Sequence, residues 1–168
     1  MMRKTVKVLV VGGGAVGTSI AYHLGKIGWD TLLLERDELT SGSTWHAAGL
    51  LPYFNMSYAT THIHDYSIKF YKGLEQETGL NVGFSVVGNL RMAQTDERMD
   101  EYMLYASTAE TCDVPYEWLS PKQIKDRYPL VRTDDLKGAI YHPTDGYINP
   151  ADVTMAMAKG ARQHGVII

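Results

Sequence analysis

The chain has 168 residues, of which 45% are hydrophobic and 21% charged, a composition typical of a folded globular protein. Its formal net charge of −3 gives no electrostatic reason to expect a nucleic-acid partner or an anionic membrane surface. The single cysteine, Cys112, excludes an internal disulfide and favours a reducing compartment, and no Cys/His cluster has the spacing of a metal site.

The N-terminus gives no sign of a targeting segment. Residues 1–4 lead almost directly into an apolar run, which leaves no room for a signal or transit peptide. No apolar run approaches the roughly 20 residues that span a bilayer. We therefore expect a cytoplasmic protein with no membrane partner.

The first 35 residues have the pattern of a dinucleotide-binding βαβ unit. Residues 6–11 predict a buried parallel strand, and Gly12, Gly14 and Gly17 form a G-x-G-x-x-G turn before a helix. In such a turn the glycines allow close approach of the backbone to a pyrophosphate, and the helix start offers free N–H groups. Apolar residues at helical spacing are expected to face the sheet: Val16, Ile20 and Leu24.

A second strand over residues 31–34 ends in Glu35 and Arg36. Glu35 lies where this motif places an acid that accepts hydrogen bonds from ribose hydroxyls. An acid at this position favours an unphosphorylated ribose, as in FAD or NAD, over NADP.

The loop over residues 42–50 brings His46 to a place where the ring of a bound flavin could lie. Small neighbours let the backbone pass close to a cofactor, and Ser43 and Thr44 can donate hydroxyl hydrogen bonds. From the residues alone, a flavin attachment site and a partly buried histidine bonded to the backbone explain His46 equally well.

The middle of the chain alternates less regularly. The spacing of apolar residues and the capping residues predict helices over residues 60–78, 95–111 and 120–128. Residues 83–94 predict a hairpin that turns at Gly88 and Asn89, and residues 139–141 and 147–148 predict two edge strands joined by a loop.

The last part of the chain predicts a return to the first sheet. Asn149 and Pro150 form a helix start, residues 151–164 a helix with Val153, Met157 and Ala161 on one stripe, and residues 166–168 the opening of a strand. Because that strand begins without its neighbours, we expect the chain to be a truncated, N-terminal piece of a larger enzyme.

Together these elements predict an α/β fold: a Rossmann-like FAD-binding domain with a parallel sheet, and part of an inserted α+β subdomain. We expect residues 1–50 to form the nucleotide-binding unit and the flavin loop, residues 51–148 the inserted subdomain, and residues 149–168 the helix and strand that return to the nucleotide-binding sheet.

Residues 38–50, with Trp45 next to His46, resemble the flavin-attachment segment of the dimethylglycine dehydrogenase and sarcosine dehydrogenase family, within the D-amino-acid-oxidase-like FAD-dependent oxidoreductases. The similarity extends to residues 66–69, 77–79, 88–91 and 145–150. The glycine turn and the Asp-Gly…Pro helix entry are shared by the wider superfamily, whereas the Trp-His pair is more specific to the amine dehydrogenases.

The resemblance implies FAD bonded covalently to the His46 imidazole, and it places the groups that bind the substrate outside this chain, so no catalytic residue is assigned. It also implies a folate-binding domain, hence tetrahydrofolate, in the full-length protein. The candidate cofactor-binding residues from the motif and the resemblance together are Gly12, Gly14, Ala15, Val16, Gly17, Glu35, Arg36, Gly42, Ser43, Thr44, Trp45, His46, Ala47, Ala48, Gly49 and Leu50.

The function implied is oxidative demethylation of a small N-methylated amino acid, such as dimethylglycine or sarcosine. A hydride would pass from the N-methyl carbon to flavin N5, with electron-transfer flavoprotein or O2 as the acceptor. Two alternatives stay open. An NAD-dependent dehydrogenase would share the first 35 residues but gives no reason for the loop over residues 42–50, and a truncated flavin domain would be inactive.

Overall fold

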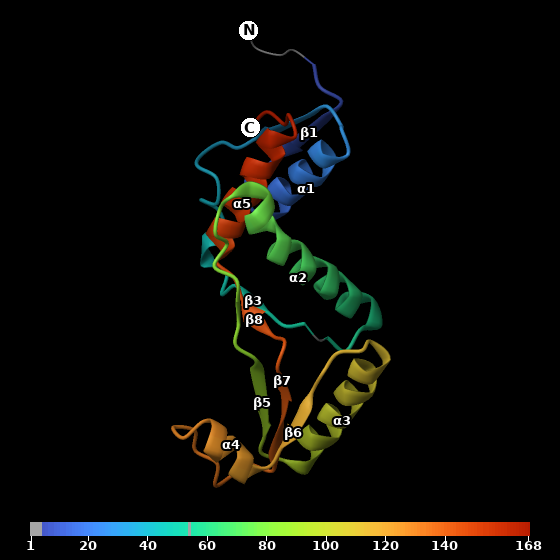
Figure 1. Ribbon diagram of the computed structural model, residues 1–168, viewed down its shortest axis with the longest axis vertical. Coiled ribbons are helices and arrows are strands. Elements are labelled where there is room, and N and C mark those ends of the chain that lie inside the picture. The colour runs from blue at the N-terminus through green and yellow to red at the C-terminus, as the bar shows by residue number, and fades with distance from the viewer. Residues whose placement is uncertain (1–4, 54) are drawn as a thin grey trace. The chain divides into compact units, whose positions relative to one another are not determined.

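A computed structural model describes residues 5–53 and 55–168, so the N-terminal Met1–Lys4 segment used above lies outside the described residues. The chain divides into two compact units (Figure 1). The first unit combines Met1–Gly49, Phe70–Phe84 and Ile148–Ile168, and the second combines Leu50–Lys69 and Ser85–Tyr147. Residues 70–84, which the sequence division assigned to the inserted part, thus belong to the first unit.

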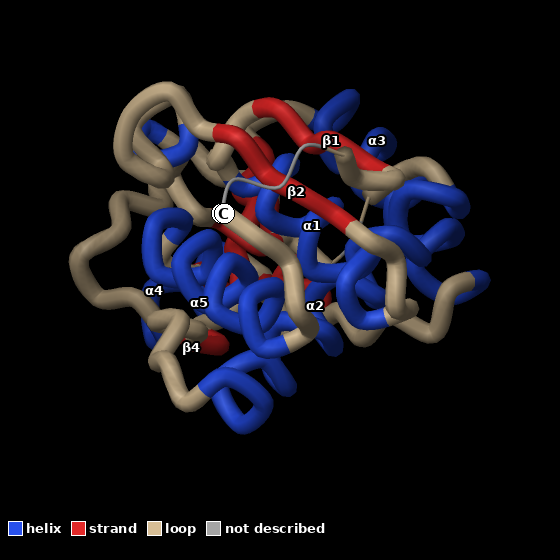
Figure 2. The backbone as a smooth tube through the Cα atoms, turned by 90° about the horizontal axis from the view of Figure 1, so that it is seen from above, coloured by secondary structure: helices blue, strands red, loops and turns tan. Residues whose placement is uncertain are grey.

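The first unit contains the predicted βαβ unit, but its first strand is not buried as predicted, since only Val10 is buried while Leu9 is 52% and Val11 77% exposed. Strands β1 (Val8–Val11) and β2 (Thr31–Leu34) pair in parallel, with Val8 opposite Thr31, and α1 (Ala15–Lys26) connects them. Seen from above, the two strands lie side by side with α1 beneath them (Figure 2). Ile167 forms a parallel bridge to Leu32 on the other side of β2, as expected for the returning strand. The predicted α/β class with a parallel sheet is confirmed.

Helix α5 (Pro150–Gln163) packs against α1 in this unit (Figure 1). Glycines allow the close approach, because Gly160 lies under the ring of the fully buried Tyr22 and Gly25 lies against Val166. The helix begins as predicted: the Asn149 side chain accepts hydrogen bonds from the first backbone N–H groups of the helix, and Pro150 follows. The predicted stripe is buried at Val153, Met157 and Ala161.

The buried face of α1 differs from the prediction. Val16 is 75% exposed and Ile20 45% exposed, whereas the buried residues are Thr18, Ala21, Tyr22 and Gly25. Small residues and one aromatic ring are buried here because α1 packs closely against another helix as well as against the sheet. Apolar periodicity alone does not reveal this second neighbour.

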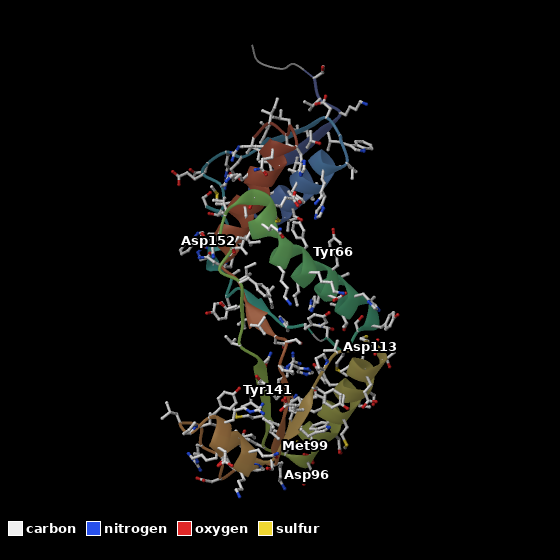
Figure 3. All side chains as sticks on the ribbon, in the orientation of Figure 1. Tyr66, Asp96, Met99, Asp113, Tyr141 and Asp152 are labelled. Atoms are coloured by element: carbon white, nitrogen blue, oxygen red, sulfur yellow. The ribbon has the colours of Figure 1, made fainter. Side chains whose placement is uncertain are left out.

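The main sheet of the second unit contains three antiparallel strands. β7 (Gly138–His142) lies between β5 (Asn89–Ala93) and β6 (Glu117–Leu119). Helix α3 (Asp96–Thr111) covers it through a core of Ala93, Tyr102, Ala106 and Ile140, with Met99 packed against that core (Figure 3). Helix α4 (Pro121–Arg127) has the predicted capping box between Ser120 and Gln123.

A second small sheet corrects two strand predictions. Its central strand is β8 (Gly146–Tyr147), which pairs with β3 (Leu50–Leu51) and β4 (Ser85–Val86). The hairpin predicted over residues 83–94 is therefore wrong, since β4 and β5 belong to different sheets. β7 and β8 are each central rather than edge strands. The reason is tertiary: Val87 and Gly88 donate their N–H groups to the carbonyl oxygen of Asp145, which redirects the chain at the glycine turn.

Two further elements complete the fold. Helix α2 (Tyr58–Thr78) ends before Gly79, whose φ of +69° suits a helix stop, as predicted. The short 3-10 helix η1 (Thr44–His46) lies beside α5 in the first unit. Within the described residues, no helix is both long and apolar enough to cross a bilayer.

Candidate functional site

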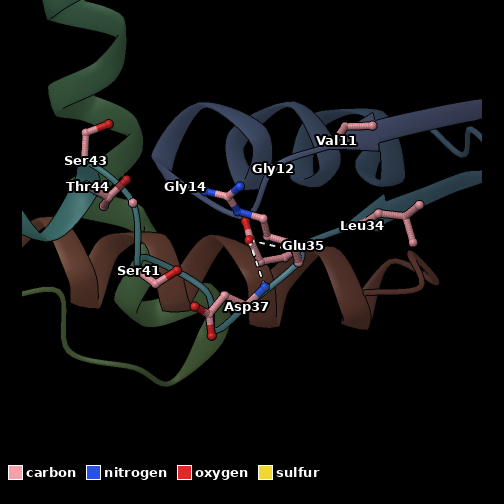
Figure 4. A pocket seen from close by; sticks show the side chains of 11 residues that line it. Val11, Gly12, Gly14, Leu34, Glu35, Asp37, Ser41, Ser43 and Thr44 are labelled. Atoms are coloured by element: carbon pink, nitrogen blue, oxygen red, sulfur yellow. Dashed lines mark hydrogen bonds between the residues drawn. The ribbon is translucent and has the colours of Figure 1, made fainter.

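A cavity of about 430 Å³ lies where β1 and β2 end, between the glycine turn and the loop that follows β2 (Figure 4). Because parallel strands end on the same edge of a sheet, the turn after β1 and the acid after β2 meet here. The cavity is lined by Val11, Gly12, Gly14, Leu34, Glu35, Arg36, Asp37, Ser41, Gly42, Ser43 and Thr44.

Two positions of the glycine turn, Gly12 and Gly17, require glycine for different reasons. Gly12 has a φ of +108°, which strongly favours glycine, and the space beside its Cα is open. A Cβ on Gly17 would overlap the carbonyl oxygen of Gly12, so the start of α1 can pack against the turn only with glycine there. The turn thus leaves an open approach to the backbone on the cavity side.

Backbone N–H groups in this turn fall into two sets. Three of them have acceptors: Gly12 donates to the Leu34 carbonyl, Gly13 to the Glu35 carboxylate and Ala15 to the Thr44 hydroxyl. The N–H groups of Gly14, Val16 and Gly17 have no acceptor within the described part of the chain. Free N–H groups at a helix start, together with the positive end of the helix dipole, form a binding site for an anion such as a diphosphate.

Glu35 lies at the centre of the cavity wall (Figure 4). One carboxylate oxygen accepts a hydrogen bond from Gly13 N–H at 2.5 Å, and the other accepts from the N–H groups of Arg36 and Asp37 at 2.8 and 3.1 Å. These backbone donors, that of Gly13 first, hold the pKa of Glu35 below its ordinary value. The side chain is therefore a carboxylate that can accept further hydrogen bonds from hydroxyl groups.

The loop after β2 is tied to the turn. Thr40, in the left-handed region with a φ of +74°, donates its N–H to the Gly13 carbonyl at 3.2 Å, and the Leu39 side chain packs on Gly13. Thr44 Oγ1 accepts from Ala15 N–H at 3.0 Å. The loop therefore closes one side of the cavity with hydroxyl groups.

His46 is the last residue of η1 and follows Thr44, which lines the cavity, by two positions. Its Nδ1 lies 3.3 Å from the carbonyl oxygen of Gly42, which lines the cavity. Its ring lies against the Trp45 ring, with centroids 3.7 Å apart and planes tilted by 34°. Both side chains are exposed, Trp45 by 60%. His46 is thus beside the cavity, held by its neighbours and accessible.

Seven of the sixteen predicted cofactor residues line the cavity. They are Gly12, Gly14, Glu35 and Arg36 together with the 42–44 segment. Ala15 and Gly17 do not line the cavity, but Ala15 bonds to Thr44 and Gly17 packs against Gly12, which do. Val16 is exposed at the helix start. Outside the lining are Trp45, His46, Ala47, Ala48 and Gly49, and Leu50 belongs to the second unit.

Four lining residues were missed by the sequence reasoning: Val11, Leu34, Asp37 and Ser41. Val11 and Leu34 are the last residues of the two parallel strands, so a rule that counts strand ends as part of the site would have found them. Asp37 and Ser41 lie in an irregular loop whose path no periodicity predicts.

The second unit has a cavity of its own, of about 450 Å³, lined in part by Asn89, Arg91, Asp145 and Tyr147. Asp145 Oδ1 accepts a hydrogen bond from Tyr53 N–H at 2.8 Å. Burial raises the pKa of Asp145 and lowers that of its neighbour His142. Backbone anchoring of Tyr53 gives this buried carboxylate a structural role.

The first cavity fits a dinucleotide. Gly12 has open space where a Cβ would point, the turn beside the cavity has N–H groups that could bind an anion, and the Glu35 carboxylate lines the same cavity. A diphosphate needs donors and a close backbone approach, and an unphosphorylated ribose needs an acceptor. The residues present supply each of these.

Comparison with known proteins agrees with this geometry. The model of the family described as FAD dependent oxidoreductase matches residues 7–168. The chain is 45% identical over 161 residues to mitochondrial dimethylglycine dehydrogenase of Rattus norvegicus. This match covers 95% of the chain and 19% of that protein. It is 43% identical over 164 residues to the formaldehyde-forming 4-methylaminobutanoate oxidase of Paenarthrobacter nicotinovorans, covering 97% of the chain and 20% of that protein.

A third relative is named as a regulatory subunit and not as an oxidoreductase. The mitochondrial regulatory subunit of pyruvate dehydrogenase phosphatase from Mus musculus is 41% identical over 163 residues, covering 96% of the chain and 19% of that protein. The chain thus spans about a fifth of the length of these three curated relatives.

Among solved structures, L-proline dehydrogenase from P. horikoshii matches with a TM-score of 0.91 and 26% identity, covering 99% of this chain and 44% of that one. The fold described above is therefore shared with this solved dehydrogenase structure. This chain belongs to the FAD dependent oxidoreductase family.

Proposed function

We propose that this chain forms the FAD-binding part of an enzyme that oxidatively demethylates an N-methylated amino acid of the dimethylglycine or sarcosine type, with FAD bonded covalently to His46. The observation that carries the proposal is the cavity at the ends of β1 and β2, where anion donors, a ribose acceptor and the loop of His46 meet. The names of two relatives support the substrate class: one acts on dimethylglycine and one on 4-methylaminobutanoate.

Each part of the cavity has a role in holding FAD. The free N–H groups of Gly14, Val16 and Gly17 bind the diphosphate. The Glu35 carboxylate accepts hydrogen bonds from the ribose hydroxyls of the adenosine. Thr44, which already accepts from Ala15, can donate its own hydroxyl proton to a phosphate oxygen. These contacts bind the cofactor before any covalent bond forms.

The tautomer of His46 decides which nitrogen is available for the bond. With a proton on Nδ1, the ring donates to the Gly42 carbonyl at 3.3 Å and keeps a lone pair on Nε2. The stacked Trp45 ring restricts rotation of the imidazole. The loop thus presents Nε2 as the atom that would bond to the 8α-methyl carbon of the flavin. A C–H bond of that methyl group would break, its proton would pass to solvent, and O2 would take up the two electrons released.

When bound, FAD supplies the redox chemistry, accepting a hydride equivalent from the N-methyl carbon at N5. The chain's own part is to hold the cofactor and to orient it through the contacts above. The product carbon leaves as formaldehyde or passes to tetrahydrofolate, and electron-transfer flavoprotein or O2 accepts the electrons. We also propose a cytoplasmic location. Several relatives are named as mitochondrial, so subcellular fractionation is the test that distinguishes the two compartments.

Acid precipitation of the full-length protein tests the covalent bond. Yellow, fluorescent material should stay with the pellet in the wild type and move to the supernatant in His46→Ala. Flavin that washes out of the wild-type pellet would show a noncovalent flavoprotein and would refute attachment through His46.

The substrate class and the cofactor are tested separately. Anaerobic addition of dimethylglycine or sarcosine should bleach the visible absorbance of the oxidised flavin, whereas glycine serves as the unmethylated control. An absorbance spectrum without flavin bands, together with NAD reduction, would instead establish the NAD-dependent alternative.

A noncatalytic role is the second candidate, and the relative named as a regulatory subunit favours it. That alternative predicts a protein that binds FAD but shows no bleaching with any N-methylated amino acid. The same titration therefore distinguishes the two candidates.

A further inference from the structure

The segment that contains His46 is fixed at both ends within the first unit. At its start, Thr44 Oγ1 accepts from Ala15 N–H at 3.0 Å. At its end, the Gly49 carbonyl accepts from Ile148 N–H at 2.8 Å. The four residues between these anchors are all exposed: Trp45, His46, Ala47 and Ala48. The backbone bonds of η1 and the Trp45–His46 ring contact hold these residues mainly to their own neighbours, so the anchors and the packing beside α5 determine where the segment lies.

Gly49 is required at the second anchor for two independent reasons. Its φ of +71° lies in the left-handed region that favours glycine. A Cβ at this position would overlap the carbonyl oxygen of Ile148 and would lie 3.2 Å from Cδ of Pro150. The first obstacle is backbone, which cannot rotate away as a flexible side chain can.

The partner of Gly49 is itself held firmly. Ile148 is buried, and the next residue, Asn149, donates its N–H to the Val82 carbonyl at 3.1 Å and caps α5 with its side chain. Helix α5 also lies beside η1. The entry of α5 therefore supports the loop at Gly49, and the helix itself supports it at Thr44–His46.

We propose that Gly49 is a positioning residue, which sets the place of the His46 imidazole by holding the end of the flavin loop against Ile148. This inference rests on the proposed attachment of FAD to His46. Bond formation at a ring nitrogen needs the two reacting atoms near contact, and a displacement of about 1 Å can cost roughly 100-fold in rate. Release of the Gly49 anchor should therefore slow attachment even where FAD still binds.

The test uses the full-length protein with two changes at the anchor. Gly49→Ala introduces the overlap and the strain. A second variant inserts two glycines between Ala48 and Gly49, which keeps Gly49 unstrained but lengthens the tether in an exposed loop that tolerates insertion. Gly28→Ala is the control for strain alone, because Gly28 has a φ of +80° and open space around its Cβ position.

Two measurements are made on each protein. Apoprotein is mixed with FAD, and the acid-stable flavin fraction is followed with time. Hydrogen exchange is measured at the amides of His46 and Ala47, which donate to Ser43 and Thr44. We expect the insertion variant to attach FAD about 100-fold more slowly at an unchanged midpoint of unfolding, with faster exchange at both amides. Gly28→Ala should lose stability without slowing attachment.

The outcomes separate this inference from the function on which it rests. Wild-type attachment rates in the insertion variant would overturn the positioning role, even if Gly49→Ala fails to fold. A wild type without acid-stable flavin would refute attachment at His46. In that case hydrogen exchange still tests whether Gly49 anchors the loop. Unchanged exchange at the His46 and Ala47 amides of the insertion variant would overturn that anchoring role.

Discussion

Thr44 Oγ1 accepts a hydrogen bond from the backbone N–H of Ala15 at 3.0 Å, which joins the loop after β2 to the first turn of α1 across 29 residues of sequence. This bond uses one of the donors at the helix start and leaves those of Gly14, Val16 and Gly17 for a ligand. The hydroxyl therefore fixes the loop and shapes the anion site at once.

Removal of this hydroxyl should weaken FAD binding. In a His46→Ala background, where binding is reversible, Thr44→Val is expected to raise the dissociation constant for FAD about tenfold, the equivalent of one hydrogen bond of about 1.4 kcal/mol. Isothermal titration calorimetry measures this dissociation constant. Thr44→Ser keeps the acceptor and should stay near the parent value, so equal affinity of the Val and Ser variants would contradict the role.

Loss of the charge at Glu35 should also reduce FAD affinity. A glutamine amide cannot accept from all three backbone donors that face the carboxylate, nor match a carboxylate as acceptor for the ribose. In the same His46→Ala background, Glu35→Gln is expected to raise the dissociation constant about tenfold or more. Glu38→Gln, an exposed acid outside the cavity, is the control. An unaltered affinity for Glu35→Gln would remove Glu35 from the site.

The glycine turn gives a steric prediction with an internal control. Gly17→Ala would place a Cβ against the Gly12 carbonyl and should abolish FAD binding or folding, as read from the flavin absorbance of the purified protein. Gly73→Ala, in the middle of α2 with no atom within 4 Å of the Cβ position, should raise the free energy of unfolding by about 0.5–1 kcal/mol. A Gly17→Ala protein with a full complement of FAD would show that the turn can open.

A polar network in the first unit predicts a loss of stability in acid. The Glu77 carboxylate accepts from the Tyr22 hydroxyl at 2.5 Å and pairs with Lys26 at 3.0 Å, and these partners, Tyr22 first, lower the pKa of Glu77 from 4.5 to about 2. Because the pKa is lower in the folded state, the contribution is complete above pH 4.5 and is lost as the pH falls towards 2.

The size of this effect is measurable by denaturant unfolding. Between pH 6 and pH 3 the wild type should lose about 1 kcal/mol more than Glu77→Gln, a value reduced for solvent screening because Glu77 is one-third exposed. Parallel pH dependences of the two proteins would show that the network contributes nothing at neutral pH.

Local signals in the sequence determined the βαβ unit, the caps of α4 and α5, and the place of Glu35 beside the glycine turn. Each depends on residues within a few positions of one another: the glycines of the turn, Ser120 with Gln123, and Asn149 with Pro150. Such signals act through short-range backbone geometry, so the same residues give the same local structure wherever the segment lies.

The tertiary structure alone decided the rest. The packing of α1 on α5, the separation of β4 from β5 into two sheets, and the two anchors of the flavin loop each join residues far apart in sequence. Gly49 shows the physical reason: its neighbours in sequence do not reveal that the carbonyl oxygen of Ile148, 99 positions further on, lies where the Cβ of any other residue would be.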